Sequence, residues 1–310
     1  MASEKCKVLV LGGTGYLGKR LVKASLREGH PTYVLQRVEN VMDINKIQAL
    51  LRLKKRGVQF IEASVSNHES LVRALKQVDV VVSALPQYSV PSLEYKVIDA
   101  IKEAGNIKRY VPSEYLIDPS RRVYTLEPVK GVSERIFAVR KAVQDAEIPY
   151  TSIAAYLFAG WYAPNLLQID TLLPPKDKVS IYGDGNAKVI ILDEDDIATY
   201  TIKTIDDPRT INKTLHLVPP ENIVSQNELI EIWEMLSGKR LEKANVSGED
   251  FLARMEGADT GTQLMVTFTH SICYEGCLTN YELGEGEEEA SKLYPDVKYT
   301  RVDEYLKRYL

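Results

Sequence analysis

Cysteine, histidine and long apolar runs are scarce in this chain of 310 residues. The three cysteines, Cys6, Cys273 and Cys277, are too sparse for a disulfide framework and indicate a reducing compartment. Together with the four histidines they form no group with metal-ligand spacing, so we expect no metal site. No apolar run reaches the roughly 18 residues that indicate a transmembrane helix. A strand is expected from residue 7, which leaves no room for a signal peptide, and we expect a soluble, cytoplasmic protein.

A surplus of positive charge is missing as well. The formal net charge is −4 at pH 7, which argues against the basic surface of a nucleic-acid-binding protein. The longest acidic run, "EGEEEA" at 285–290, is expected to be the solvated start of a helix. Apolar residues make up 45% of the chain, so a chain of this length can bury a sizeable core.

The first half of the chain alternates short β-branched runs with amphipathic segments. Strands are expected at 7–12, 32–37, 59–64, 79–85, 109–114 and 150–155. Helices are expected near 16–28, 44–56, 67–76, 92–104 and 133–146. Strands that alternate with helices pair in parallel through right-handed crossovers. The pattern therefore predicts an α/β fold, a doubly wound parallel sheet of the NAD(P)-binding Rossmann type.

The second half is less regular and predicts a smaller α/β region. Turn signals such as "LLPPKDK" and "YGDGN" separate the expected elements. Helices are expected at 194–205, 225–237, 247–256 and 302–309. We predict a nucleotide-binding domain at 1–155, joined by returning segments from about 180–218, and a mainly substrate-binding domain at 156–310.

A glycine array lies between the first expected strand and the first helix. In "VLVLGGTGYLGKRL", Gly12, Gly15 and Gly18 form the pattern G-x-x-G-x-x-G. Glycines at this point permit a tight turn and let backbone N–H groups approach a pyrophosphate at the positive end of the helix. The predicted contacts of the loop with the cofactor are Gly12, Gly13, Thr14, Gly15, Tyr16, Leu17 and Gly18.

The second expected strand ends on a cation. Arg37 stands where an acidic residue would accept a hydrogen bond from a free ribose 2′-hydroxyl. A guanidinium instead suits a 2′-phosphate, and Lys46 adds a second charge at the start of the next helix. These two residues predict NADPH rather than NADH. The alternative is that both are solvated surface cations.

Sequence blocks along nearly the whole chain resemble one known family. They include "GGTGYLGKR", "LVRALKQVDVVVSAL", "AIKEAGNIKRYVPSE", "IYGDGN" and "KLYPDVKYTRVDEYL". The chain resembles the pinoresinol–lariciresinol reductase, isoflavone reductase and phenylcoumaran benzylic ether reductase family, and most of all the pinoresinol–lariciresinol reductases. These are NmrA-like, atypical short-chain dehydrogenases. The resemblance implies an NADPH-binding Rossmann domain, a smaller substrate domain and a homodimer.

One departure from the family affects its chemistry. Family members deliver hydride from NADPH to a benzylic carbon of a lignan or related phenylpropanoid, after phenol-assisted ring opening to a quinone methide. The lysine that assists at the phenol lies four residues before the arginine of a K-x-x-V-R-[RK]-A segment. The matching segment here is "IFAVRKA", so Ile136 occupies the lysine position and Arg140 is retained. A hydrocarbon cannot donate or accept a proton.

Other positions of the family's pocket depart too. The family pattern P-S-E-F-G is matched by "PSEYL", with Leu116 in place of the glycine. An asparagine position before "FAG" holds Tyr156, and a substrate-contacting histidine aligns with Phe268, with His270 as the alternative. The resemblance implies that Arg140 and Phe158 contact the cofactor, although Phe158 is equally consistent with core packing. The residues it implies for substrate binding are Ile136, Tyr156, Phe268 and His270.

No catalytic acid or base is assigned from the sequence. A Tyr-x-x-x-Lys pair occurs only at Tyr294 and Lys298, far from the expected helix. Tyr156 is a weak candidate, since a phenol at the end of the sixth strand could relay a proton. The alternative is that Tyr156 only packs against cofactor or substrate.

We therefore expect an NADPH-dependent reductase of a lignan-like or otherwise bulky aromatic substrate, with a remodelled active site. Hydride transfer depends on geometry more than on a protein base, so an already electrophilic substrate does not require the lysine. Two alternatives remain open. One is a non-redox role, as a cyclase, an isomerase or an NADP-binding sensor. The other is a lysine-free enzyme that reduces lignans weakly.

Overall fold

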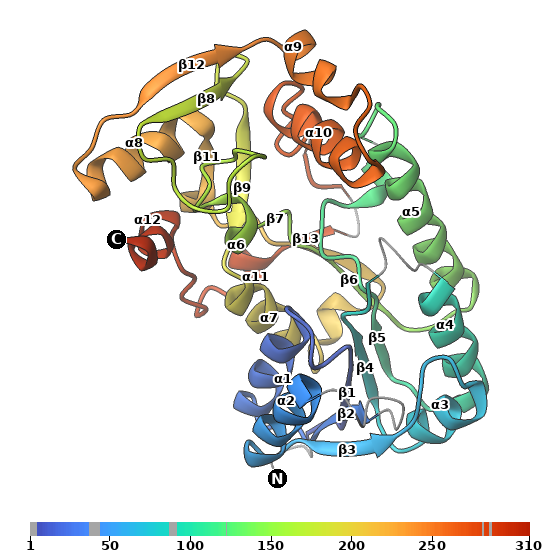
Figure 1. Ribbon diagram of the computed structural model, residues 1–310. Coiled ribbons are helices and arrows are strands. Elements are labelled where there is room, and N and C mark those ends of the chain that lie inside the picture. Colours follow the sequence, from blue (N-terminus) through green and yellow to red (C-terminus); the bar gives the residue numbers. More distant parts are fainter. Residues whose placement is uncertain (1–4, 37–43, 87–91, 122, 281, 285–286) are drawn as a thin grey trace.

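The computed structural model describes residues 5–36, 44–86, 92–121, 123–280, 282–284 and 287–310 (Figure 1). The first half alternates strands and helices as predicted. Its strands are β1 (Val8–Leu11), β2 (Thr32–Gln36), β3 (Gln59–Glu62), β4 (Val80–Ser83) and β5 (Arg109–Val111). Its helices are α1 (Gly18–Arg27), α2 (Ile44–Lys55), α3 (His68–Leu75), α4 (Ser92–Ala104) and α5 (Val129–Asp145). Within the described residues, no helix is both long and apolar enough to cross a bilayer.

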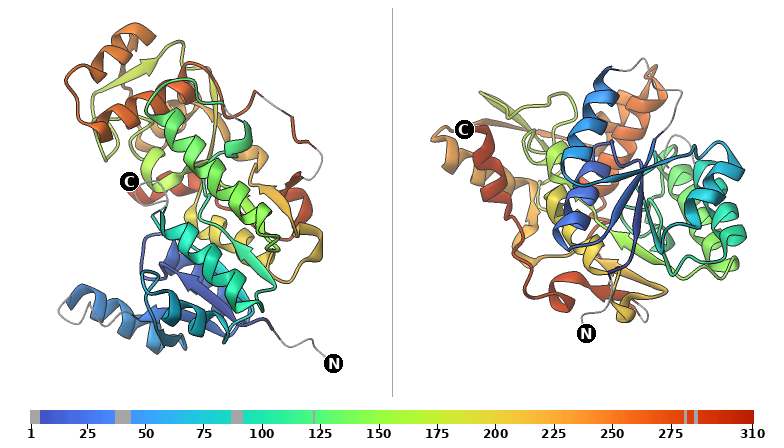
Figure 2. Two further views of the ribbon diagram at one scale, coloured as in Figure 1. Left: turned by 90° about the vertical axis from the view of Figure 1, so that its right-hand side faces the viewer. Right: turned by 90° about the horizontal axis from the view of Figure 1, so that it is seen from below.

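The strands form a parallel sheet in the order β3-β2-β1-β4-β5. The order reverses after β1, which is the arrangement of a doubly wound sheet. Helices α1 and α2 cover one face, and α3, α4 and α5 cover the other (Figure 2). All side chains of β1 and β4 are buried, as expected for strands covered on both faces. The predicted α/β Rossmann fold is confirmed.

The sheet continues beyond β5 through a single parallel bridge between Tyr110 and Tyr150. Three further parallel strands follow in the order β6 (Thr151–Ala154), β10 (Lys213–His216) and β13 (Glu287–Glu289). Helix α7 (Glu194–Lys203) lies against α1, where Lys23 forms an ion pair with Asp195 at 2.8 Å. Segments from the second half of the chain thus complete the nucleotide-binding layer. The predicted domain boundary at residues 155 and 156 stays a prediction.

The remaining elements form a second layer of structure above the strand ends (Figures 1 and 2). The strands are β7 (Leu157–Phe158), β8 (Lys178–Tyr182), β9 (Lys188–Leu192), β11 (Ile223–Ser225) and β12 (Glu242–Val246). The helices are α6 (Ala159–Tyr162), α8 (Gln226–Ser237), α9 (Gly248–Leu252), α10 (Thr260–Cys273), α11 (Ala290–Leu293) and α12 (Val302–Leu306). Helix α8 begins at a capping box formed by Ser225 and Glu228, and it matches the helix predicted at 225–237.

Two segments differ from their predictions. The sequence predicted no helix at α10, because threonines and β-branched residues in "TGTQLMVTFTHSIC" weaken the helical signal. The Asp259 side chain caps this helix by accepting from the N–H groups of Gly261 and Thr262. The acidic run at 285–290 was predicted to be a solvated helix start, but Glu287–Glu289 form strand β13. Glu287 there pairs with Arg121, and the helix starts only at Ala290.

A buried arginine ties the fifth strand to the segment that returns to the sheet. The guanidinium of Arg109 donates to the carbonyl oxygen of Thr204 at 2.6 Å and to that of Asp207 at 3.0 Å. It also donates to the hydroxyl groups of Thr151 and Thr210, at 2.9 and 2.7 Å. Arg109 is 3% exposed, so these acceptors depend on it rather than on water.

We predict that Arg109→Met lowers the free energy of unfolding by about 2–4 kcal/mol, because two backbone carbonyls lose a charged donor. Urea unfolding at 25 °C measures the change. Arg73→Met is the matched control, since Arg73 is largely exposed and pairs with exposed Glu69. The control is expected to stay within about 0.5 kcal/mol of the original protein. Equal stability of the two variants would contradict this account of Arg109.

Candidate functional site

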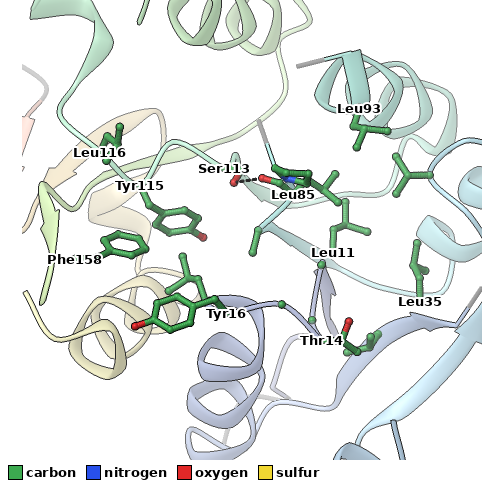
Figure 3. Close-up of a pocket in the computed structure, with 18 of the residues that line it drawn as sticks. Leu11, Thr14, Tyr16, Leu35, Leu85, Leu93, Ser113, Tyr115, Leu116 and Phe158 are labelled. Carbon is green, nitrogen blue, oxygen red and sulfur yellow. Dashed lines mark hydrogen bonds between the residues drawn. The ribbon is translucent and has the colours of Figure 1, made fainter. Parts of the chain in front are cut away.

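A cavity of about 590 Å³ lies at the carboxyl ends of the parallel strands (Figure 3). This is where open α/β sheets bind their ligands, next to the point at which strand order reverses. The nucleotide end of the cavity is lined by Leu11–Leu17, Val34, Leu35, Ser64–Ser66 and Ala84–Pro86. The other end is lined by Ser113, Tyr115, Leu116, Phe158, Trp161 and Tyr162, whereas Leu93 lies on the side of Leu11 and Leu35 (Figure 3).

The glycine loop can form only with glycine at two of its positions. Gly12 has φ +71°, and a Cβ atom there would lie 2.5 Å from the carbonyl oxygen of Ala84. A Cβ atom on Gly18 would lie 2.0 Å from the carbonyl oxygen of Gly12. The loop is thus pressed against the end of β4 and the start of α1. The first turn of α1 carries no acidic residue, so its positive end suits a pyrophosphate.

Six of the seven predicted loop contacts, Gly12 to Leu17, line the cavity, and Gly18 begins α1 beside it. Their backbone is the part of the chain that would hold a dinucleotide. Arg37 lies outside the described residues. Lys46 lies on α2, but its side chain is also outside them. The predicted 2′-phosphate contacts of these two residues therefore stay predictions.

Three aromatic rings form a wall at one side of the cavity. Tyr16 of the glycine loop stacks on Trp161 with ring centroids 6.2 Å apart, and Trp161 stacks on Phe158 at 5.8 Å. Arg20 covers the ring of Tyr16 at 4.3 Å. Burial, with the nearby Glu194 carboxylate, raises the pKa of Tyr16 to about 12, so its phenol keeps its proton. Phe158 thus lines the cavity, and its predicted contact with the cofactor stays a prediction.

Arg140 lies behind the cavity, in a buried group of charges, and does not line it. Its guanidinium is 2.6 Å from the Glu114 carboxylate and also pairs with Asp118. Burial opposes the charge of Arg140, but the two carboxylates outweigh it and hold its pKa above the usual value. Because Glu114 lies between Ser113 and Tyr115, Arg140 orders the strand end that does line the cavity. Its predicted contact with the cofactor stays a prediction.

Ile136 is 5% exposed and lies one helical turn before Arg140 on α5. It is not among the described residues that line the main cavity. Its helix neighbours Lys130, Ser133, Glu134 and Phe137 line a second cavity of about 390 Å³, together with Pro119 and Tyr124. The position that the resemblance aligns with the family's lysine thus holds a buried hydrocarbon.

Tyr156 is not among the described residues that line either cavity. It has φ +53°, and its hydroxyl forms a 2.8 Å hydrogen bond with Nδ1 of His216. Nε2 of His216 lies 3.4 Å from Glu287, and burial lowers the pKa of this histidine, which favours a neutral ring. In the neutral ring, Nδ1 can accept a hydrogen bond from the Tyr156 hydroxyl, and Nε2–H can point toward Glu287. The hydroxyl of Tyr156 is thus engaged by His216, and its role as a proton relay or substrate contact stays a prediction.

Carboxylate and imidazole atoms of this group are close enough to share a cation. Ligand atoms of Asp118, His216 and Glu287 all lie within 4.8 Å of one another. Arg140 and Arg121 already pair with the two carboxylates, which supplies the positive charge that a metal ion would bring.

The two substrate residues predicted on α10 lie in different places. Phe268 is buried between Tyr162 of the main cavity and Tyr124 of the second, with ring centroids 6.0 and 5.7 Å away. His270 stacks on Tyr274 at 4.8 Å, and its Nδ1 lies 3.5 Å from Glu275. His270 is not among the described residues that line either cavity, so its predicted substrate contact is not seen.

Several lining residues were not singled out from the sequence, among them Tyr115, Trp161 and Tyr162. Their signal is positional, since each follows the carboxyl end of a strand. Tyr115 directly follows "PSE" in the family pattern, and Trp161 directly follows "FAG".

A buried carboxyl lies beneath the cavity floor. Glu94 of α4 accepts a hydrogen bond of 2.6 Å from the hydroxyl of Ser83, the last residue of β4. It accepts a second hydrogen bond from the hydroxyl of Tyr110 in β5. Burial raises the pKa of Glu94 to about 7, although both hydrogen bonds oppose the rise. The folded protein therefore holds a proton on Glu94 at pH values where the unfolded chain has lost it.

We predict that the free energy of unfolding falls as pH rises from about 4.5 to 7 through this one group, by roughly 3 kcal/mol in total. The sign follows because the folded state binds more protons than the unfolded state in that window. Urea unfolding at pH 5 and pH 7.5 is the measurement. Glu94→Gln is expected to remove this part of the pH dependence, whereas Glu69→Gln, at an exposed position, is expected to retain it. Parallel pH profiles for Glu94→Gln and the original protein would contradict the prediction.

Comparison with known proteins places this geometry in a family. The model of the NmrA-like family matches residues 4–306. The chain is 55% identical over 310 residues to an isoflavone reductase homolog of Lupinus albus, covering 99% of both chains. It is 54% identical over 313 residues to a bifunctional pinoresinol-lariciresinol reductase of Linum perenne, covering 99% of this chain and 100% of that one. The solved structure of AtPrR2 with NADP+ and (+)pinoresinol superposes with a TM-score of 0.95 at 51% identity, covering 99% and 100% of the two chains. The chain therefore belongs to the NmrA-like family, among the pinoresinol–lariciresinol reductase-like and isoflavone reductase-like proteins.

Proposed function

We propose that this chain is an NADPH-dependent reductase of a phenylpropanoid-derived or comparably bulky aromatic substrate, working without the family's lysine. The observation that carries the proposal is a continuous cavity, with the glycine loop at one end and an apolar, aromatic wall at the other. A dinucleotide on the loop and an aromatic molecule against the wall would share this space. Relatives with more than half of their residues identical include pinoresinol-lariciresinol reductases, which supports the substrate class.

The chain's own residues would hold each part of the cofactor. The backbone of Gly12–Leu17 and the positive end of α1 suit the pyrophosphate. Phe158 lies at the other end of the cavity, where the nicotinamide would lie. When bound there, NADPH supplies a hydride from C4 of its nicotinamide. The preference for NADPH over NADH rests on Arg37 and Lys46 in the sequence.

The buried hydrocarbon at position 136 limits the class of substrate that we propose. Ether-ring opening gains from a group that takes the phenol proton, and Ile136 cannot take it. General acid–base help is typically worth about 10²–10⁴-fold in rate. We therefore propose a substrate that is already electrophilic, such as an aromatic enone, an iminium ion or a preformed quinone methide. Reduction of lignan ethers would be a slower form of the same activity.

Ile136 also favours a second candidate. With no acid or base at that position, the chain could keep the cofactor site for a cyclisation, an isomerisation or NADP sensing. Both candidates require cofactor binding, and they differ in whether NADPH is consumed. A cytoplasmic homodimer is proposed as the setting, from the sparse cysteines and from the family resemblance.

We predict that the purified protein binds NADPH and oxidises it with aromatic enones or iminium compounds, but about 10²–10⁴-fold more slowly with pinoresinol. Absorbance at the NADPH band measures turnover, and fluorescence titration measures binding. Ile136→Lys is expected to raise turnover of pinoresinol more than turnover of the enone. Ile136→Met is the matched control, because it has similar length but no proton to exchange, and it is expected to leave the ratio of the two rates unchanged. If NADPH binds and no substrate of the panel consumes it, the non-redox candidate replaces this proposal.

A further inference from the structure

We propose that the Tyr115 hydroxyl is the hydrogen-bond donor that binds and polarises a carbonyl-type oxygen of the substrate during hydride transfer. The inference rests on the proposed function and names the group that acts in place of the absent lysine. The substrate class is thereby narrowed to conjugated electrophiles that carry an oxygen, such as enones and quinone methides.

Tyr115 is buried and faces the cavity. It follows β5 by a few residues, lies in the wall between Ser113 and Leu116, and is 4% exposed. In Figure 3 its ring lies near Phe158, and its hydroxyl is directed away from Phe158, toward the space above the glycine loop. The side chain therefore directs a buried O–H group toward the place where the cofactor end and the aromatic end of the cavity meet.

Within the described part of the chain, the hydroxyl of Tyr115 has no hydrogen-bond partner. Leaving a buried hydroxyl unpaired costs free energy, so such a group in a cavity wall is a candidate to pair with a ligand. The family pattern P-S-E-F-G has phenylalanine at this position, which would fill the same volume without that cost. The additional oxygen of this chain thus stands at the substrate end of the cavity.

Two neighbouring hydroxyl groups are engaged elsewhere. The Ser113 hydroxyl donates to the carbonyl oxygen of Leu85 at 2.9 Å. The Tyr16 phenol lies beside the Glu194 carboxylate, which holds its proton. Tyr115 is a buried phenol of this wall whose O–H has no partner among the described residues.

The protonation state of Tyr115 decides which role it can take. Burial, with a smaller contribution from Glu94, raises the pKa of its phenol far above neutral pH. The group is therefore a donor of a hydrogen bond and not a base. A preorganised donor in a cavity that excludes water stabilises an oxygen on which negative charge develops.

Hydride transfer to such a substrate needs no other proton donor from the protein. Hydride adds to the electrophilic carbon, and the π pair of the conjugated system moves onto the oxygen, giving an enolate or phenolate and oxidised cofactor. The O–H group of Tyr115 stabilises that oxygen without losing its proton. The product takes its final proton from water after release.

Binding to the oxidised complex tests the proposal without turnover. We predict that Tyr115→Phe weakens binding of an unreactive aromatic ketone to the NADP+ complex by about 10–100-fold. Binding of the analogue in which CH₂ replaces the carbonyl is expected to stay unchanged, as is the affinity for NADP+. Tyr33→Phe is the matched control, because it removes a phenol from β2 outside the described cavity lining. The melting temperature of Tyr115→Phe is expected to hold or rise, since a buried unpaired hydroxyl is removed.

Two results would overturn the inference. One is ketone binding by Tyr115→Phe that equals that of the original protein. The other is a loss confined to NADP+ affinity, which would assign the hydroxyl to the cofactor's carboxamide oxygen instead of the substrate. Failure of the proposed function would give a different result. The original protein would then bind the ketone through Tyr115 and still oxidise no NADPH with any enone.

Discussion

The close approach of the glycine loop to the end of β4 is the constraint on which the rest of the site depends. Only a residue without a side chain leaves room between Gly12 and the carbonyl oxygen of Ala84, and only glycine at position 18 lets α1 start against the loop. This contact fixes β1, β4 and α1 relative to one another. The reversal of strand order beside it opens the cavity, so the backbone that would hold a pyrophosphate and the floor of the substrate end are set together.

The wall opposite the loop depends on buried charge. Arg140 holds Glu114 and Asp118, and Arg121 holds Glu287, so the segment after β5 is anchored on both sides of Tyr115 and Leu116. Buried pairs of this kind add little stability compared with apolar packing, but breaking one partner is costly, and they enforce one arrangement of the chain. Tyr156 and His216 belong to the same group of buried charged and polar side chains, which holds the wall in place. In the account proposed above, Tyr115 is the residue of the wall that acts on the substrate.

Local patterns in the sequence were enough to predict the parallel sheet and the glycine loop, because each depends on spacing within one βα unit. The hydrogen bond of Tyr156 to His216 was not predictable, since Tyr156 has a left-handed backbone although it is not glycine and its partner lies 60 residues away. The pairing of Arg121 with Glu287 joins residues 166 positions apart and leaves no local signal. Helix α10 was missed because its composition favours strands, and its stability comes from capping and packing.

Hydride transfer in the presence of Ile136 is the central claim, and isotopic labelling tests it most directly. The purified protein would be incubated with an aromatic enone and with NADPH carrying deuterium at C4, one stereoisomer at a time. The account predicts a reduced product that contains deuterium on the former electrophilic carbon with one of the two labelled cofactors. A protein that binds NADPH yet transfers deuterium from neither stereoisomer to any conjugated electrophile would contradict it.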